Sequence, residues 1–192
     1  MPRHVAWVAA GSSQWVSAGG RDGSLAAAED QALLELVDGA AGLGIRWLTI
    51  QEPSSGRALE GRDRPGIRVV RRRLGAPLDA AEHEGLLVVL EPPASGRQEL
   101  VEAIRRLADD GVDPDDVRES TIARYLDLPD VDLLVKTGGE RCIPDLLLWQ
   151  AAYSELVFLD VLWPDVRRDH LFDAVEEYRR RDRRYGGVVA SK

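Results

Sequence analysis

Short apolar runs alternate with longer amphipathic stretches along most of this chain, and this alternation restricts the fold more than any other feature. Runs such as 4–10 and 86–90 are apolar at nearly every position, which is typical of strands buried on both faces. Between the first two runs, leucine and alanine recur at helical spacing over 25–41. Strands alternating with helices predict an α/β fold with a mostly parallel central sheet flanked by helices.

The remaining elements follow from the same patterns. The predicted strands are 4–10, 45–51, 67–72, 86–90, 131–135 and 156–159. The predicted helices are 25–41, one starting near Ser95, one from Pro114 to about Leu126, 145–153, and a long charged one from Arg168 onward. The polar, aperiodic segment 53–65 predicts a loop. No repeat or linker is visible, so a single domain over 1–192 is expected.

Composition excludes several classes of function. The single cysteine, Cys142, rules out an internal disulfide framework and suits a reducing compartment, so we expect a cytoplasmic protein. The net charge of −8 argues against nucleic-acid binding. No apolar run reaches the length of a membrane span, so we expect at most peripheral contact with a membrane.

Two segments that follow predicted strands contain candidate ligand-binding residues, because ligands of parallel sheets bind outside the carboxyl ends of the strands. The turn at 11–13 could hold an anion through backbone N–H groups. Lys136 and Arg141 flank Gly138 and Gly139, a combination that suits phosphate binding. The alternative is a strand-to-helix turn that needs two glycines for its backbone geometry.

Two further features have open interpretations. Glu155 could bind a divalent cation, but Mg²⁺ usually requires one or two carboxylates together with substrate phosphates. The basic run at 178–185 is explained either by a solvated helix end, where cations complement the helix dipole, or by a function.

Four motifs carry a resemblance to a known family. They are DLLVKTGGE at 132–140, LLWQAAYSEL at 147–156, DVLWPD at 160–165 and YRRRDRRYGG at 178–187. With them, residues 130–188 resemble the C-terminal third of the cis-prenyltransferases, the family that contains undecaprenyl diphosphate synthase. The resemblance implies that family's fold, with a shortened tunnel region because the loop at 53–65 replaces the helix that walls the product tunnel. It also implies a chemistry in which isopentenyl diphosphate extends an allylic diphosphate with Mg²⁺.

The resemblance fails at the catalytic centre. The family holds Mg²⁺ and the allylic diphosphate with an Asp-Gly-Asn-Gly-Arg-Trp loop after the first strand. Here Ala10 replaces the aspartate, Ser12 the asparagine and Gln14 the arginine. Each lost charge-assisted hydrogen bond is worth about 1.5–3 kcal/mol, so the resemblance implies a degenerate allylic site.

The second diphosphate site is also altered. Lys136 stands for the family's first arginine, and Lys cannot reproduce the bidentate contact of a guanidinium. Cys142 aligns with the second arginine, and Pro144 with a serine. Glu155 matches the family's metal-binding glutamate, but the aspartate that accompanies it there is missing.

The C-terminal Arg184-Tyr185-Gly186 matches the family's Arg-x-Gly motif, which completes the isopentenyl diphosphate site of the other subunit. A degenerate pocket with this motif retained resembles the regulatory subunits of heteromeric cis-prenyltransferases, such as the Nogo-B receptor. The resemblance thus implies a non-catalytic subunit that supports a catalytic cis-prenyltransferase in a heterodimer or heterotetramer. It implies no cofactor bound by this chain alone, with Mg²⁺ and the isoprenoid diphosphates in the partner's site.

Two alternative functions stay open at this point. One is a divergent homodimeric prenyltransferase that makes short chains, with arginines of the 53–65 loop supplying cations. The other is a non-enzymatic protein that binds a prenyl lipid or acts as a scaffold.

Overall fold

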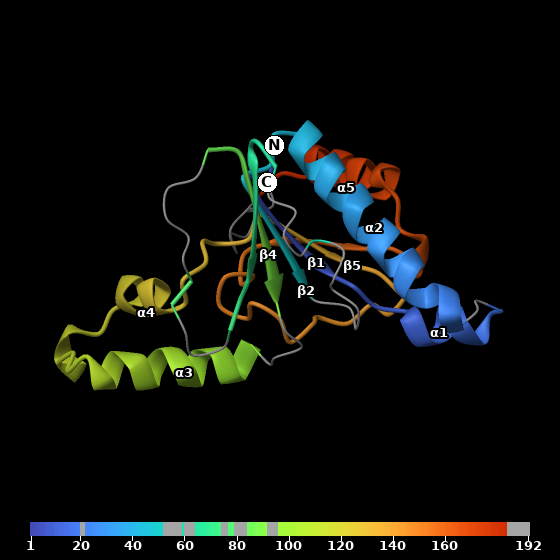
Figure 1. Cartoon of the computed structure of the whole chain (residues 1–192). Helices are drawn as coiled ribbons and strands as arrows, with labels where there is room; N and C mark the ends of the chain where they lie inside the picture. The colour runs from blue at the N-terminus through green and yellow to red at the C-terminus, as the bar shows by residue number, and fades with distance from the viewer. Residues whose placement is uncertain are drawn as a thin grey trace, which may run out of the picture.

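The six strands that the structure describes belong to one parallel sheet. The computed structural model describes residues 1–19, 22–51, 59, 64–73, 77–78, 84–91 and 96–183. Within them, the strand order is β3-β4-β2-β1-β5-β6 and every neighbouring pair is parallel (Figure 1). The strands are β1 (His4–Val8), β2 (Trp47–Gln51), β3 (Ile67–Arg71), β4 (Leu86–Glu91), β5 (Leu133–Lys136) and β6 (Glu155–Phe158). The predicted fold class is confirmed.

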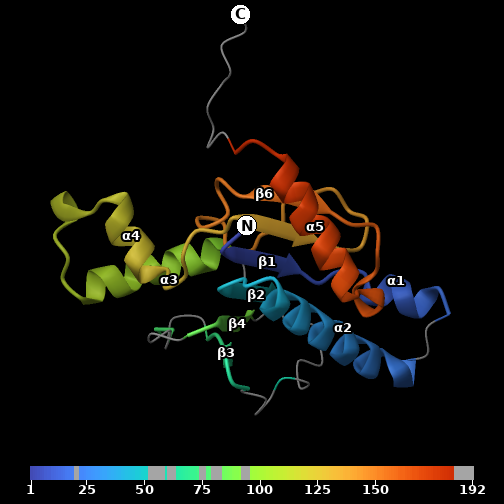
Figure 2. The same ribbon diagram turned by 90° about the horizontal axis from the view of Figure 1, so that it is seen from above.

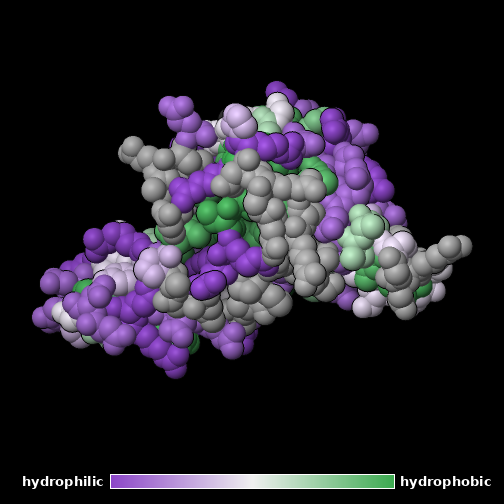
Figure 3. Space-filling view, viewed as in Figure 1, coloured by the Kyte–Doolittle hydropathy of each residue, from purple (hydrophilic) through white to green (hydrophobic). Residues whose placement is uncertain are grey.

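Helices cover the sheet from two sides. They are α1 (Ser12–Ser17), α2 (Asp22–Gly42), α3 (Gly96–Asp109), α4 (Glu119–Tyr125) and α5 (Arg168–Arg180), with short 3₁₀ turns η2 (Pro114–Asp116) and η3 (Trp163–Asp165). Helices α2 and α5 lie side by side, whereas α3 and α4 form an arm that extends from the other side of the sheet (Figures 1 and 2). The surface of this arm in Figure 3 is mostly hydrophilic.

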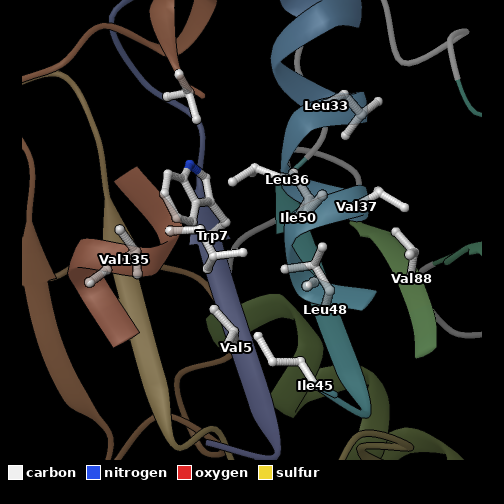
Figure 4. Packing of buried hydrophobic residues seen from close by; sticks show 14 of the residues in the cluster. Val5, Trp7, Leu33, Leu36, Val37, Ile45, Leu48, Ile50, Val88 and Val135 are labelled. Atoms are coloured by element: carbon white, nitrogen blue, oxygen red, sulfur yellow. The ribbon is translucent and has the colours of Figure 1, made fainter. Parts of the chain in front are cut away.

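Alternate residues of β1 enter two different apolar clusters. Val5 and Trp7 pack with residues of β2 and α2 in the larger cluster (Figure 4). Ala6 and Val8 belong to a second cluster with Leu147 and other residues on the opposite face. Because both faces are covered, every residue of β1 is buried, which explains why these strands are continuous apolar runs.

The structure corrects the expected helix over 145–153. These residues form a succession of turns, because Leu147 adopts a left-handed backbone conformation with φ of 48° that no α-helix accommodates. The expected helix from Pro114 to Leu126 is divided into η2 and α4. The division occurs at Arg118, which is extended, and the Thr121 side chain accepts a hydrogen bond from its backbone N–H. The loop predicted at 53–65 lies almost entirely outside the described residues.

The first strand is shorter than expected and is followed by a helix that was not predicted. The strand ends at Val8, and Gly11 has a φ of +100°, a left-handed conformation that favours glycine. The chain then enters α1 at Ser12. Among the described residues, no helix is both long enough and apolar enough to span a bilayer.

Buried His4 makes stability depend on pH. Its Nδ1 lies 3.0 Å from the Pro129 carbonyl and its Nε2 lies 2.9 Å from the Thr49 hydroxyl, an arrangement that a neutral imidazole satisfies. Burial lowers the pKa of His4 from 6.5 to about 4, although the Pro129 carbonyl opposes the change. Below pH 6.5 the unfolded chain binds a proton on His4, whereas the folded chain excludes this proton down to about pH 4. The free energy of unfolding therefore decreases as the pH is lowered through this window.

We therefore expect the titration of His4 to lower the free energy of unfolding by about 2 kcal/mol when the pH is lowered from 7 to 5. Urea unfolding of the wild type and of His4→Gln at both pH values measures it, because the variant lacks this titration. An equal pH dependence in the two proteins would contradict the expectation.

Candidate functional site

The turn at the end of β1 is bonded to the end of β5, its neighbour in the sheet. This segment, residues 9–12, is called the Ala10 turn here. The Ala10 N–H donates to the Thr137 hydroxyl at 2.9 Å, and that hydroxyl lies 3.0 Å from the Ala10 carbonyl. The same carbonyl accepts a hydrogen bond from the backbone N–H of Trp163 at 3.0 Å. Because Thr137 is fully buried, the position of the Ala10 turn is set by the interior of the protein.

Gly138 and Gly139 lie against this turn. Both have positive φ, +87° and +76°, and a Cβ on Gly138 would lie 3.2 Å from the Ala10 Cβ. The two candidate segments from the sequence are therefore adjacent. However, the N–H of Gly138 donates to the Val161 carbonyl at 2.9 Å, and that of Gly139 to the Leu159 carbonyl at 3.1 Å. These N–H groups are used within the protein, which favours the interpretation of the glycines as a requirement of backbone geometry.

Lys136, at the end of β5, is buried and bonded to its own neighbours. Its Nζ lies 2.7 Å from the Cys142 Sγ and 3.2 Å from the Glu140 carboxylate. Desolvation lowers the pKa of Lys136, but the bonds to Cys142 and Glu140 outweigh it and the net shift is upward. The ammonium is thus charged and already engaged, whereas Arg141 is exposed.

A buried carboxylate close to the Ala10 turn was missed by the sequence reasoning. Glu29 of α2 is only 1% exposed, and its Oε1 accepts a hydrogen bond from the Ser12 hydroxyl at 2.6 Å. Helical spacing could have revealed it, because Glu29 precedes Leu33 and Leu36 by four and seven residues and so shares their buried face. Gln14, by contrast, is exposed on α1.

Glu155 lies away from the Ala10 turn. It is the first residue of β6 and pairs in register with Leu133, the first residue of β5, so it occupies the amino end of the sheet. Its carboxylate accepts a hydrogen bond from Arg181 at 3.2 Å. Within the described ranges, no group of three or more His, Cys, Asp or Glu residues is arranged to hold a metal ion.

The described part of the C-terminal segment is fastened at that same amino end. The Arg183 guanidinium lies 2.5 Å from the Asp132 carboxylate, which also accepts the backbone N–H groups of Arg3 at 2.7 Å and His4 at 3.1 Å. Arg184, Tyr185 and Gly186 come directly afterwards and lie outside the described residues.

Comparison with known proteins assigns the chain to a family. The family model described as "Putative undecaprenyl diphosphate synthase" matches residues 70–186. The chain belongs to the undecaprenyl diphosphate synthase family. It is 35% identical to a trans,polycis-polyprenyl diphosphate synthase of Thermobifida fusca over 98% of this chain and 82% of the relative. It is 34% identical to the decaprenyl diphosphate synthase of Mycobacterium tuberculosis over 98% of this chain and 78% of that protein.

Solved structures of similar proteins share the fold. Lavandulyl diphosphate synthase from Lavandula x intermedia superposes with a TM-score of 0.79 at 24% identity, over 96% of this chain and 98% of that one. A probable undecaprenyl diphosphate synthase from Campylobacter jejuni superposes with a TM-score of 0.73 at 20% identity, over 97% of this chain and 99% of that one. The alignment with the Thermobifida relative runs over 232 residues, more than the 192 of this family member. That relative therefore contains segments that this chain lacks.

Proposed function

We propose that this chain is a non-catalytic subunit of a heteromeric cis-prenyltransferase, of the type that the Nogo-B receptor represents. The observation that carries the proposal is the chemistry at the Ala10 turn. A methyl group occupies the position where the family resemblance expects the metal-binding aspartate, and neutral side chains stand where it expects the asparagine and the arginine.

These residues do not fit a Mg²⁺–diphosphate site. A diphosphate is a polyanion that is bound by cations and a metal ion, and the side chains of Ala10, Ser12 and Gln14 supply neither a positive charge nor a carboxylate. The cation at the end of β5, Lys136, is already bonded to Glu140 and Cys142. Glu155, the other candidate ligand, lies at the opposite end of the strands and is bonded to Arg181. We therefore place Mg²⁺ and the allylic diphosphate in the catalytic partner.

The anchoring of the C-terminal segment supports donation of the Arg-x-Gly motif to another chain. Arg183 is held beside Asp132 and His4, at the amino end of β1, whereas Ala10 follows its carboxyl end. The Arg183 guanidinium thus lies at the end of the sheet opposite to the Ala10 turn. The isopentenyl diphosphate site of a partner subunit is our proposed target for the motif at 184–186.

Joint purification and assay test this proposal. The chain is co-expressed with a complete family member, and each protein is assayed alone and together with Mg²⁺, isopentenyl diphosphate and an allylic diphosphate. We expect a stable complex, no turnover by this chain alone, and a higher rate for the complex than for the partner alone. A partner that is fully active and indifferent to this chain would disprove the proposal.

A point substitution tests the donated motif. Arg184→Ala is expected to leave the complex intact and to lower kcat/KM for isopentenyl diphosphate by about tenfold or more, because a charge-assisted hydrogen bond to phosphate is lost. Arg179→Ala is the matched control, since Arg179 is exposed and bonded to Glu176 on α5. Equal kinetics for the two variants would refute the role of Arg184.

The names of the relatives favour one other candidate function. Proteins 34–35% identical over nearly the whole chain are prenyl diphosphate synthases, which is compatible with a divergent enzyme that works as a homodimer. Turnover of short allylic diphosphates by the purified single chain with Mg²⁺ would support this candidate, and lack of turnover would exclude it.

A further inference from the structure

A concentration of arginine at the carboxyl end of β3 is unusual in a chain with a net charge of −8. Four of the six residues from 68 to 73 are arginine, and three of them, Arg71 to Arg73, lie at or just beyond the end of this strand. β3 is a terminal strand in the strand order of the sheet, and its last residue is Arg71. The carboxyl ends of parallel strands are where ligands of such sheets bind, so this cationic segment lies at the ligand-binding edge of the fold.

These arginines line a cavity of about 300 Å³, which we call the β3 groove. Its lining residues are Arg68, Val70, Arg71, Arg72, Arg73, Pro77 and Leu78. The groove thus combines several guanidinium groups with an apolar wall. A volume near 300 Å³ is at the lower end of the range for small-molecule sites and is sufficient for a phosphorylated head group.

The four arginines differ in their surroundings. Arg72 is buried, and the carboxylates of Glu91 at 2.8 Å and Glu99 at 2.6 Å neutralise its charge. Its Nε–H nevertheless has no hydrogen-bond acceptor among the described residues. Arg71 and Arg73 are exposed. They therefore present guanidinium groups at the surface of the groove, where an anion can reach them.

We propose that the β3 groove binds the phosphate or diphosphate group of an amphiphilic ligand. The planar guanidinium group matches phosphate oxygens in a bidentate geometry, which makes arginine the preferred residue for this recognition. Val70, Pro77 and Leu78 provide an apolar surface for the adjoining hydrocarbon part. Three strand spacings separate β3 from β1, about 15 Å, so the groove is distinct from the Ala10 turn.

Binding experiments on the full chain alone test this inference independently of any partner subunit. One arm titrates inorganic pyrophosphate by calorimetry, which represents a soluble source of the anion. The other measures cosedimentation with phosphatidylcholine vesicles that contain phosphatidic acid, with pure phosphatidylcholine vesicles as the blank. The test variant is R71A/R73A, and the control variant R105A/R179A removes two exposed charges elsewhere. Arg72 is left unchanged because it is part of the buried ion network.

We expect binding in at least one arm, weakened about tenfold or more by R71A/R73A and retained by R105A/R179A. Pyrophosphate binding identifies a soluble ligand, and binding to vesicles alone identifies a lipid head group. Absence of binding in both arms would overturn the inference. Equal weakening in the two double variants would overturn it as well, because it would show a general effect of net charge.

Discussion

Replacing Arg72 by methionine is expected to lower the free energy of unfolding by about 3–5 kcal/mol. The guanidinium contacts the carboxylates of Glu91 and Glu99 and donates to the Leu126 carbonyl at 3.0 Å, and all three charged side chains are at least 90% buried. Without Arg72, these two buried carboxylates would lose the cation that both contact in the described part of the chain. Removing one partner of a buried ion network costs more than the network contributes, because the desolvated charges remain.

The pH dependence of this loss separates an electrostatic cause from a loss of packing. Burial raises the pKa of Glu91, and Arg72 opposes that rise. In the Arg72→Met variant the opposing charge is gone, so Glu91 takes up a proton more readily as the pH falls, and the loss of stability shrinks between pH 7 and pH 5. Urea unfolding of the wild type and of Arg72→Met at pH 7 and at pH 5 measures this change in the loss of stability. A loss that does not change with pH would contradict the electrostatic explanation.

Two comparisons complete the Arg72 experiment. Arg105→Met removes a guanidinium that is 67% exposed and paired with Glu102, and it is expected to change stability by less than about 1 kcal/mol. Adding Glu91→Gln and Glu99→Gln to Arg72→Met is expected to restore part of the loss, because neutral amides are cheaper to bury. A triple variant less stable than Arg72→Met would contradict this expectation.

Trp163→Ala is expected to destabilise the chain by about 3–5 kcal/mol through the cavity that it leaves. Trp163 is fully buried in the larger apolar cluster, and its indole N–H has no hydrogen-bond acceptor among the described residues. The ring therefore acts by packing. Its backbone N–H also holds the Ala10 carbonyl, so the cavity would loosen the Ala10 turn as well.

Urea unfolding of two further variants provides the comparison for Trp163. Trp163→Phe is expected to lose less than half as much stability, since it keeps most of the packing and breaks no hydrogen bond of the described structure. Tyr153→Ala removes an aromatic ring that is 64% exposed and is expected to change stability by about 0.5 kcal/mol or less. Similar losses for Trp163→Ala and Tyr153→Ala would contradict the cavity mechanism.

The strands and the candidate site were accessible from sequence to different degrees. Apolar runs located β1, β2 and β4 within two residues of their ends, because burial on both faces requires apolar side chains at consecutive positions. The turns over 145–153 were mistaken for a helix, since an apolar periodicity does not reveal the left-handed conformation of Leu147. Similarly, the motif around Lys136 left open both a phosphate site and a turn that needs two glycines, and the hydrogen bonds of Gly138 and Gly139 became visible only in the structure.

The linear pattern of apolar residues was enough to establish an α/β chain with a parallel sheet, and the motifs were enough to indicate its family. Periodicity is a local property, so it can be read along the chain. The proximity of Ser12 to Glu29, the ion network of Arg72 and the distance of Glu155 from the Ala10 turn depend on the three-dimensional arrangement. That arrangement follows from the order of strands in the sheet and from the packing of the helices, which join residues far apart in the chain.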